Sequence, residues 1–256
     1  MTTTIATWNV NSVRSRLCHI TSWLEVNEVD ILCLQETKVQ DSEFPKETFL
    51  KVGFKTEFLG QKSYNGVCIL FNKKAELYCR NVPGLEDEQK RLIAITQNNS
   101  LFINIYVPNG SSLGSEKFEY KIRWLDAFTE WISGRCKEFD NIFVLGDFNI
   151  APCDLDVHDP EEWRNKILCS ADERAYIEKL KSFGFIDLFR SANQNLKEFS
   201  WWDYRAASFR RNRGLRIDLI LALTAKKIVH KCWIDSTPRG WEKPSDHTPV
   251  LARVDL

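Results

Sequence analysis

The chain has 256 residues, of which 43% are hydrophobic, so it is long and apolar enough to bury a sizeable core. Its 35 basic and 35 acidic side chains cancel, which means that overall charge favours neither nucleic acid nor a membrane surface as a partner. No apolar run is long enough to span a bilayer, and the start, MTTTIATWNV, lacks the features of a signal peptide. We therefore expect no membrane partner and a cytoplasmic location.

The predicted elements alternate between strands and helices along the whole chain. Apolar runs bounded by turn residues predict strands at TIATW, DILCL, GVCILF, RLIAI, LFINIYV, NIFVLG, IDLILA and PVLARV. Apolar residues three and four apart predict helices at VRSRLCHITSWLEVN, FEYKIRWLDAFTEWIS and DERAYIEKLKSF. No linker divides the chain, so we expect a single domain over 1–256. Continuously apolar strands favour layered sheets flanked by helices over an open barrel.

The eight cysteines are scattered along the chain. No CxxC pair and no Cys/His cluster at zinc spacing occurs among them. Cys33 and Cys68 lie inside apolar runs, where a thiol behaves as a small buried hydrophobic group. We expect all eight to be reduced and structural.

Polar residues follow several predicted strands. These residues are Asn9, Glu36, Asn109, Asp147 and Asn149. A single Asn or Asp in such a place is usually a turn former or a helix cap. Glu36 has little turn preference, however, and the recurrence at successive strand ends favours a functional site built on a rigid sheet.

One histidine is a candidate for catalysis. Asp246 and His247 are adjacent in the segment EKPSDHTPV, where a proline on each side restricts the backbone. Imidazole titrates near neutral pH and is readily oriented by a carboxylate. Asp218 interrupts the apolar run IDLILA and needs a partner if it is buried, and His247 is a suitable one.

Carboxylates, amides and one histidine, without a nucleophilic serine or cysteine motif, point to metal-assisted hydrolysis. Glu36 would hold a hard cation such as Mg²⁺, with Mn²⁺ as an alternative, because both prefer oxygen ligands. The ion would polarise a phosphoryl oxygen and absorb developing charge. The amides and a tyrosine would then bind the phosphate without adding negative charge.

The segment WWDYRAASFRRNRGLRID, residues 201–218, carries five arginines against two acids and is therefore net positive in a neutral chain. Basic residues interleaved with aromatic ones suit DNA, because cations neutralise phosphates and aromatic groups fill the space of an extruded or missing base. The alternative interpretation is a solvated loop above a small aromatic cluster.

Taken together, TWNVNSVR, LQETK, GQKSYNGV, YVPNG, GDFNIAP, SWWDYR, NRGLRIDL and EKPSDH resemble the exonuclease III branch of the endonuclease/exonuclease/phosphatase superfamily. The resemblance runs from about residue 5 to the C-terminus. It implies a four-layer α/β sandwich of two packed mixed β-sheets flanked by helices. It also implies a monomeric, Mg²⁺-dependent DNA repair nuclease that cuts duplex DNA 5′ to abasic sites and has 3′–5′ exonuclease and 3′-end phosphatase or phosphodiesterase activity.

The same resemblance implies roles for individual residues. Glu36 would be the metal ligand, supported by Asn9, with Asp246 in the metal environment. Asp147 would orient or deprotonate the attacking water, and Asp218 would orient His247, which stabilises the pentacovalent transition state. The scissile phosphate would be contacted by Tyr106, Asn109 and Asn149.

The resemblance also implies DNA contacts outside the catalytic centre. Tyr64 and Asn65 would reach the DNA backbone or the minor groove. Trp202 and Leu215 would line a pocket for the abasic sugar, with Arg216 close by.

Two alternative functions share parts of this pattern. A phosphodiesterase or phosphatase of the same superfamily that acts on a non-DNA phosphoester would share Glu36, Asp147 and His247, but it predicts no arginine–aromatic segment. A catalytically inactive DNA-binding relative would be expected to have lost one of these three residues, and all three are present.

Overall fold

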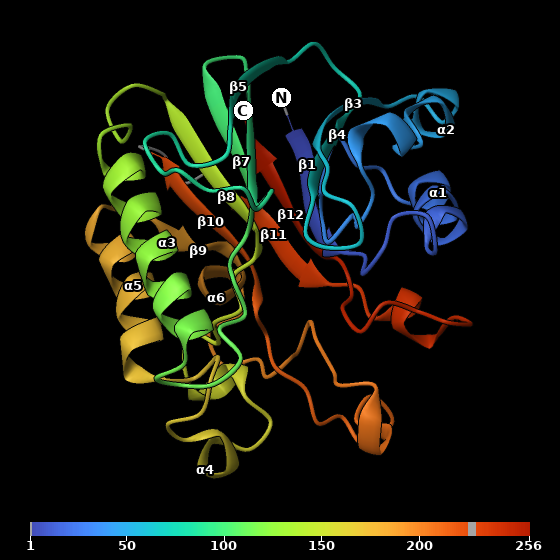
Figure 1. The fold of residues 1–256 in the computed structure, drawn as a ribbon. Coiled ribbons are helices and arrows are strands. Elements are labelled where there is room, and N and C mark those ends of the chain that lie inside the picture. The colour runs from blue at the N-terminus through green and yellow to red at the C-terminus, as the bar shows by residue number, and fades with distance from the viewer. Residues whose placement is uncertain (1, 225–228) are drawn as a thin grey trace.

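The computed structural model describes residues 2–224 and 229–256, and their strands form two six-stranded sheets (Figure 1). In sheet A the order is β11 (Val229–Ile234), β12 (Val250–Asp255), β1 (Thr2–Asn9), β2 (Ile31–Gln35), β4 (Val67–Phe71) and β3 (Lys55–Leu59). In sheet B it is β5 (Glu76–Arg80), β6 (Leu92–Gln97), β7 (Ser100–Tyr106), β8 (Asn141–Asp147), β10 (Asp218–Thr224) and β9 (Ile186–Asp187).

The helices cover the outer faces of the two sheets. Figure 1 shows α1 (Leu17–Val26) and α2 (Lys46–Lys51) on one side of the molecule, and α3 (Glu116–Ser133) and α5 (Ala171–Ser182) on the other. The short α4 (Pro160–Trp163) lies in a loop at one end, and α6 (Leu188–Ala192) packs against β10 and β11. The expected four-layer α/β sandwich is therefore confirmed.

Each interface between layers has its own apolar core. Ile69, Phe102 and Phe143 belong to the cluster between the sheets. The other two clusters join sheet A to the first helix pair and sheet B to the second, with members such as Trp23 and Trp124. Burial of this kind contributes about 1.5–3 kcal/mol for each large apolar side chain.

All eight predicted strands form, and four others were missed. The missed strands are β3, β5, β9 and β11, which are the edges of the two sheets. The three predicted helices form as α1, α3 and α5, although α1 begins at Leu17, later than the pattern suggested. Among the described residues every cysteine is free, as expected.

A buried amide links the two sheets near the ends of their central strands. Asn104 of β7 donates from Nδ2 to the carbonyls of Leu34 and Cys68, at 2.9 and 2.8 Å, in sheet A. Nε2 of Gln35 donates in return to Oδ1 of Asn104 at 2.7 Å. Because buried polar groups must be paired, this link specifies how the sheets lie on each other and so places the ends of β2 and β7 together.

No helix in the described part of the chain is long and apolar enough to cross a membrane.

Candidate active site

Strand register brings the predicted polar residues to one end of the sandwich. In the parallel pair β7 and β8, Tyr106 lies opposite Asp147, and in the antiparallel pair β8 and β10, Asp147 lies opposite Asp218. In sheet A, Asn9 is the last residue of β1 and lies opposite Gln35, which directly precedes Glu36. The residues that end strands in both sheets therefore meet in space.

Gly146 is required by the close approach of β7 to β8. Its φ of 153° is uncommon for residues with a side chain, and a Cβ at this position would lie 1.9 Å from the carbonyl oxygen of Ile105. The glycine thus permits the bend that presents Asp147 at the strand end.

Several non-glycine residues at this end have left-handed backbone. The φ values are 45° for Asn11, 52° for Glu36, 54° for Lys38 and 49° for Asn149. Sparsely populated conformations of this kind cost on the order of 1–3 kcal/mol each and tend to cluster at functional sites. They turn the chain sharply out of the strands, so that these side chains lie over the sheet ends.

Asn9 connects the two carboxylates of the site across the sheets. Its Nδ2 donates to Oε1 of Glu36 and to Oδ2 of Asp147, at 2.9 Å in both cases. Its Oδ1 accepts from the backbone amide of Asn11 at 3.0 Å, which fixes the orientation of the amide. Asn9 therefore holds Glu36 and Asp147 close together, as a supporting residue should.

Asp147, His247 and Asp218 form a buried series. Nε2 of His247 lies 3.7 Å from Oδ2 of Asp147, and Nδ1 lies 2.8 Å from Oδ2 of Asp218. The hydroxyl of Ser200 also donates to this oxygen of Asp218, at 2.6 Å. The imidazole ring is thus fixed on one side and directed at Asp147 on the other.

Burial and neighbouring charges act against each other on the pKa values of Asp147 and His247. Burial raises the pKa of Asp147 to about 7, although His247 opposes the shift. Burial alone would lower the pKa of His247, but Asp218 and Asp147 outweigh it and raise this pKa to about 10. At neutral pH the ring is therefore an imidazolium that faces a carboxyl group able to exchange its proton.

We expect the His247 ring to titrate with a midpoint near pH 10 when followed by NMR, and Asp218→Asn to lower this midpoint. His19 is an internal reference, because burial lowers its pKa. Since the folded value of His247 lies above the unfolded value of about 6.5, its contribution to stability is complete below about pH 6.5 and is lost as the pH rises through 10. A wild-type midpoint near 6.5 would contradict this assignment.

Two amides and a tyrosine lie beside Asp147. The backbone amide of Asn149 donates to Oδ1 of Asp147 at 2.9 Å, and its Nδ2 donates to the carbonyl of Val107 at 2.9 Å. Nδ2 of Asn109 donates to Oδ1 of Asn149 at 3.0 Å. Burial raises the pKa of Tyr106 well above its usual value, and the charge of Glu36 adds to the shift, so the phenol stays a proton donor.

The two carboxylates fit a hard divalent cation, whereas the protonated His247 lies beside them and offers no lone pair. One ligand atom from each of Glu36, Asp147 and His247 lies within 4.8 Å of the others. Burial would raise the pKa of Glu36, but Lys38 and Asn9 hold it below its usual value, so the group is a carboxylate. Glu36 is the residue best placed to bind the cation, since oxygen ligands of this kind suit Mg²⁺.

The structure places Asp246 next to this group rather than within it. Its Oδ1 accepts from Nδ2 of Asn11 and its Oδ2 from Nε1 of Trp201, each at 3.0 Å. His247, Trp201 and Asn11 lower its pKa against the effect of burial. A place in the metal environment remains a prediction for Asp246.

Three residues of the site were not foreseen from the sequence. Nζ of Lys38 lies 2.7 Å from Oε2 of Glu36, and Asn11 joins Lys38 to Asp246. Trp201 lies against His247, with the ring centroids 6.5 Å apart. Their positions could have indicated them, because each lies in one of the motifs WNVN, LQETK and SWWDYR beside a predicted site residue.

The two adjacent tryptophans have different surroundings, and the role predicted for Trp202 in the pocket for the abasic sugar stays a prediction. Trp202 is only 3% exposed, packs edge-on against Phe209 and donates to Oδ1 of Asn212 at 3.2 Å. Successive side chains of an extended segment point to opposite sides, and of the two rings it is Trp201 that lies beside His247 and Asp246. Leu215 pairs with Trp201 and is completely buried, and its place in the pocket for the abasic sugar stays a prediction.

Arg216, which was expected close to the pocket for the abasic sugar, is fully buried, and its role in substrate binding stays a prediction. Its Nε donates to Asp156 at 2.7 Å, and Nη1 and Nη2 donate to the two oxygens of Asp187 at 3.1 and 2.6 Å. These three bonds hold the guanidinium against two carboxylates in the protein interior, away from the surface. Arg216 fixes the start of β10 beneath the site.

We expect Arg216→Met to lower the free energy of unfolding by about 3–5 kcal/mol, because Asp187 loses its ion pair and the buried Asp156 keeps only the pair with Arg190. Arg213→Met is the matched control, since it removes a partly exposed pair with Glu162 worth about 0–1 kcal/mol. Urea denaturation of both variants measures the difference. Equal losses of unfolding free energy in the two variants would show that the buried network around Arg216 contributes no more to stability than a surface ion pair.

Tyr64 and Asn65 lie at a cavity that adjoins the catalytic residues. The cavity has a volume of about 690 Å³, and Tyr106 and Asn109 line it as well. Tyr64 is 69% exposed, so it is free to meet a ligand, whereas Asn65 is nearly buried and bound to Gln61 and Gln89. Their predicted DNA contacts are thus placed beside the site and remain predictions.

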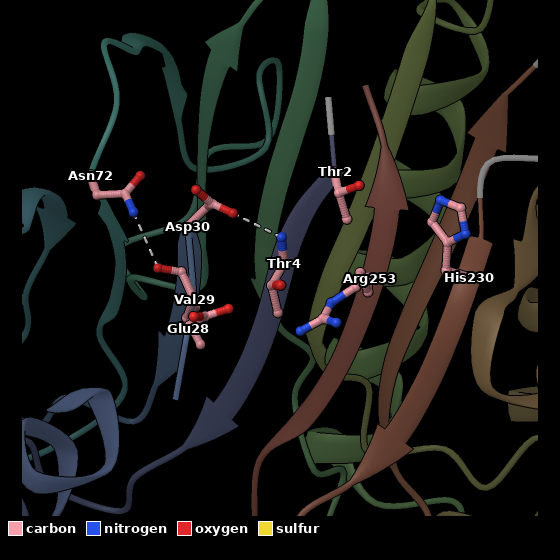
Figure 2. A pocket seen from close by; sticks show the side chains of 8 residues that line it. All are labelled: Thr2, Thr4, Glu28, Val29, Asp30, Asn72, His230 and Arg253. Atoms are coloured by element: carbon pink, nitrogen blue, oxygen red, sulfur yellow. Dashed lines mark hydrogen bonds between the residues drawn. The ribbon is translucent and has the colours of Figure 1, made fainter. Parts of the chain in front are cut away.

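Another cavity, of about 790 Å³, lies at the opposite ends of the sheet A strands (Figure 2). The backbone amide of Thr4 donates there to the carboxylate oxygen Oδ2 of Asp30 at 2.9 Å, and Arg253 comes from β12. It contains none of the predicted site residues. Cavity size therefore does not identify the chemistry of this molecule, whereas the convergence of acids, amides and imidazole does.

The sandwich and its buried acids, amides and imidazole define a class, the phosphoester hydrolases that work with a divalent ion. Residues 6–247 match the model of the Endonuclease/Exonuclease/phosphatase family, and the chain belongs to this family. An exodeoxyribonuclease III from Haemophilus influenzae is 35% identical, with 96% of this chain and 97% of the relative covered.

Solved structures give the same result. A 3′ phosphatase from Neisseria, bound to a product DNA hairpin, superposes with a TM-score of 0.96 at 39% identity, over 99% of this chain and 100% of that one. An AP endonuclease from Archaeoglobus fulgidus superposes with a TM-score of 0.92 at 37% identity, over 99% and 100% of the two chains.

Proposed function

We propose that this protein is a DNA repair nuclease that hydrolyses phosphodiesters with the help of a divalent cation, Mg²⁺ in the first place. The observation that carries the proposal is the convergence of Glu36, Asp147 and His247, whose ligand atoms lie within 4.8 Å of one another. The relatives named exodeoxyribonuclease III, 3′ phosphatase and AP endonuclease support DNA as the substrate.

Each residue of the site has a task in the proposed reaction. Asp147 takes a proton from the attacking water, for which a pKa near 7 is well suited. His247, fixed by Asp218, faces the phosphoryl oxygens with a positive ring and opposes the charge that develops on them. Asn109 and Tyr106 donate to the phosphate, and Asn149 does so by exchanging its bond of 3.3 Å to Asp147 for one to the phosphate. A cation held by Glu36 supplies further charge neutralisation when bound.

The arginine–aromatic segment supports duplex DNA over a small phosphoester. Arg205, Arg210 and Arg211 are exposed, whereas Trp201 lies at the catalytic end of the same segment. Exposed cations of this kind neutralise phosphates along a strand. We propose that residues 1–256 act as one domain and as a monomer, on abasic sites and on 3′ ends.

The test is a time course on labelled duplexes followed by product sizing. One duplex carries a single synthetic abasic site, a second a 3′-phosphate and a third an unmodified 3′ end, and sphingomyelin vesicles represent the non-DNA alternative. We expect cleavage of the DNA substrates and none in the presence of EDTA. Turnover of the lipid alone would refute the proposal.

A further inference from the structure

A buried charge that the proposed reaction does not use lies directly beneath the site. The side chains of Lys121 on α3 and Glu173 on α5 are completely buried and form an ion pair. Taking two charges out of water is costly, and such a pair is often no more stable than apolar residues of the same size. Stability alone therefore does not account for Lys121.

Lys121 contacts the backbone of Asn109 and Asn149, the two residues whose side-chain amides are assigned to the phosphate. Besides its bond to Glu173, Nζ donates to the backbone carbonyl of Asn149 at 2.7 Å and to that of Asn109 at 3.3 Å. An ammonium group has three donors, and these three acceptors use all of them. One buried side chain thus joins the loops that follow β7 and β8.

Both ends of this connection are themselves fixed. Oε1 of Glu173 accepts from the amide of Leu168, and Oε2 accepts from the amide and the hydroxyl of Ser170, which caps α5. A Cβ at Gly110 would lie 3.2 Å from Cδ of Lys121, so the glycine leaves room for the lysine stem. The arrangement is built to hold the ammonium at one point.

We propose that Lys121 is a positioning residue that sets the separation of Asn109 and Asn149, so that both amides meet the scissile phosphate together. The inference rests on the proposed function, since it assigns these amides to the phosphate. A misplacement of about 1 Å can cost about 10²-fold in rate. Lys121→Met therefore lowers kcat by about 10–100-fold, while KM changes by less than about threefold because the other phosphate contacts remain.

The kinetic test compares Lys121→Met with Arg123→Met, an exposed position on the same helix. Both changes are made in the wild-type chain and in a chain with Asn109→Ala and Asn149→Ala, and release of a 3′-phosphate from duplex DNA is measured. If Lys121 acts through the amides, its effect shrinks to less than about threefold once they are absent. An equal loss in both backgrounds, or no loss in the wild type, overturns the proposal.

A spectroscopic arm separates this inference from the proposed function. The side-chain NH₂ signals of Asn109 and Asn149 shift in Lys121→Met and stay in place in Arg123→Met. Unmoved signals overturn the positioning role, whereas inactivity of the wild type on every DNA substrate counts against the proposed function alone. If Lys121→Met does not fold, the pair Lys121→Met with Glu173→Gln removes both charges together and serves in its place.

Discussion

Asp147→Asn is expected to lower kcat on abasic or 3′-phosphate duplexes by about 10²–10⁴-fold, the range that a positioned general base contributes. The substitution keeps the shape of the side chain but removes the group that accepts the proton. It also turns an acceptor into a donor where Asn9 and the backbone of Asn149 both donate. Single-turnover kinetics above and below pH 7 measure the loss.

Asp140→Asn is the matched control for this variant. Asp140 directly precedes β8, is exposed and lies at the far end of the strand from Asp147. Its substitution leaves kcat within about twofold, as surface changes usually do. DNA binding by Asp147→Asn remains measurable, because the arginine segment is unchanged. Wild-type rates in Asp147→Asn would remove this residue from the mechanism.

Glu36→Gln is expected to have the second large effect, on cation binding. Loss of an outer-shell partner already costs about 10–100-fold in metal affinity, so loss of a direct ligand costs at least as much. The concentration of Mg²⁺ that gives half-maximal activity rises accordingly. Calorimetric titration with Mn²⁺ provides a second readout that does not depend on activity.

Glu43→Gln is the control, since Glu43 is exposed and pairs with Arg14 away from the site. The same substitution there leaves cation binding unchanged. Equal affinity in Glu36→Gln and in the wild type would show that the cation binds elsewhere.

The interior of the fold was predictable and its edges were not. Central strands are buried on both faces and appear as continuous apolar runs. In contrast, β3, with the sequence KTEFL, is only partly buried, β5, with ELYCR, is largely exposed, and both carry charges. Charged residues on edge strands discourage pairing with other chains. The same charged residues interrupt the apolar pattern, so the edge strands could not be recognised in the sequence.

That the polar residues of the candidate site meet in space was predictable, because strand ends converge by topology. Asn9, Glu36 and Asp147 each follow an apolar run, and the parallel pairs bring such ends together. Direction and burial were harder to predict. The sequence does not show which of Trp201 and Trp202 faces the site, because that depends on which side of the extended segment each side chain points to. The burial of Arg216 depends on acids 29 and 60 residues away.

Lys121 left a signal that was overlooked. It lies on the apolar stripe of α3 together with Phe118, Leu125 and Phe128, at helical spacing. A lysine in the middle of such a stripe needs a buried partner, and that partner, Glu173, lies 52 residues away.

The central claim is that Glu36, Asp147 and His247 form one hydrolytic centre for DNA phosphates. The most direct test is a crystal grown with Mn²⁺ and a duplex that ends in a 3′-phosphate, in which anomalous scattering locates the manganese ion. We expect a manganese peak at the carboxylate of Glu36, and we expect the phosphate to contact Asn149 and His247. A manganese peak in the cavity of Figure 2, with no ion or phosphate at Glu36, would contradict it.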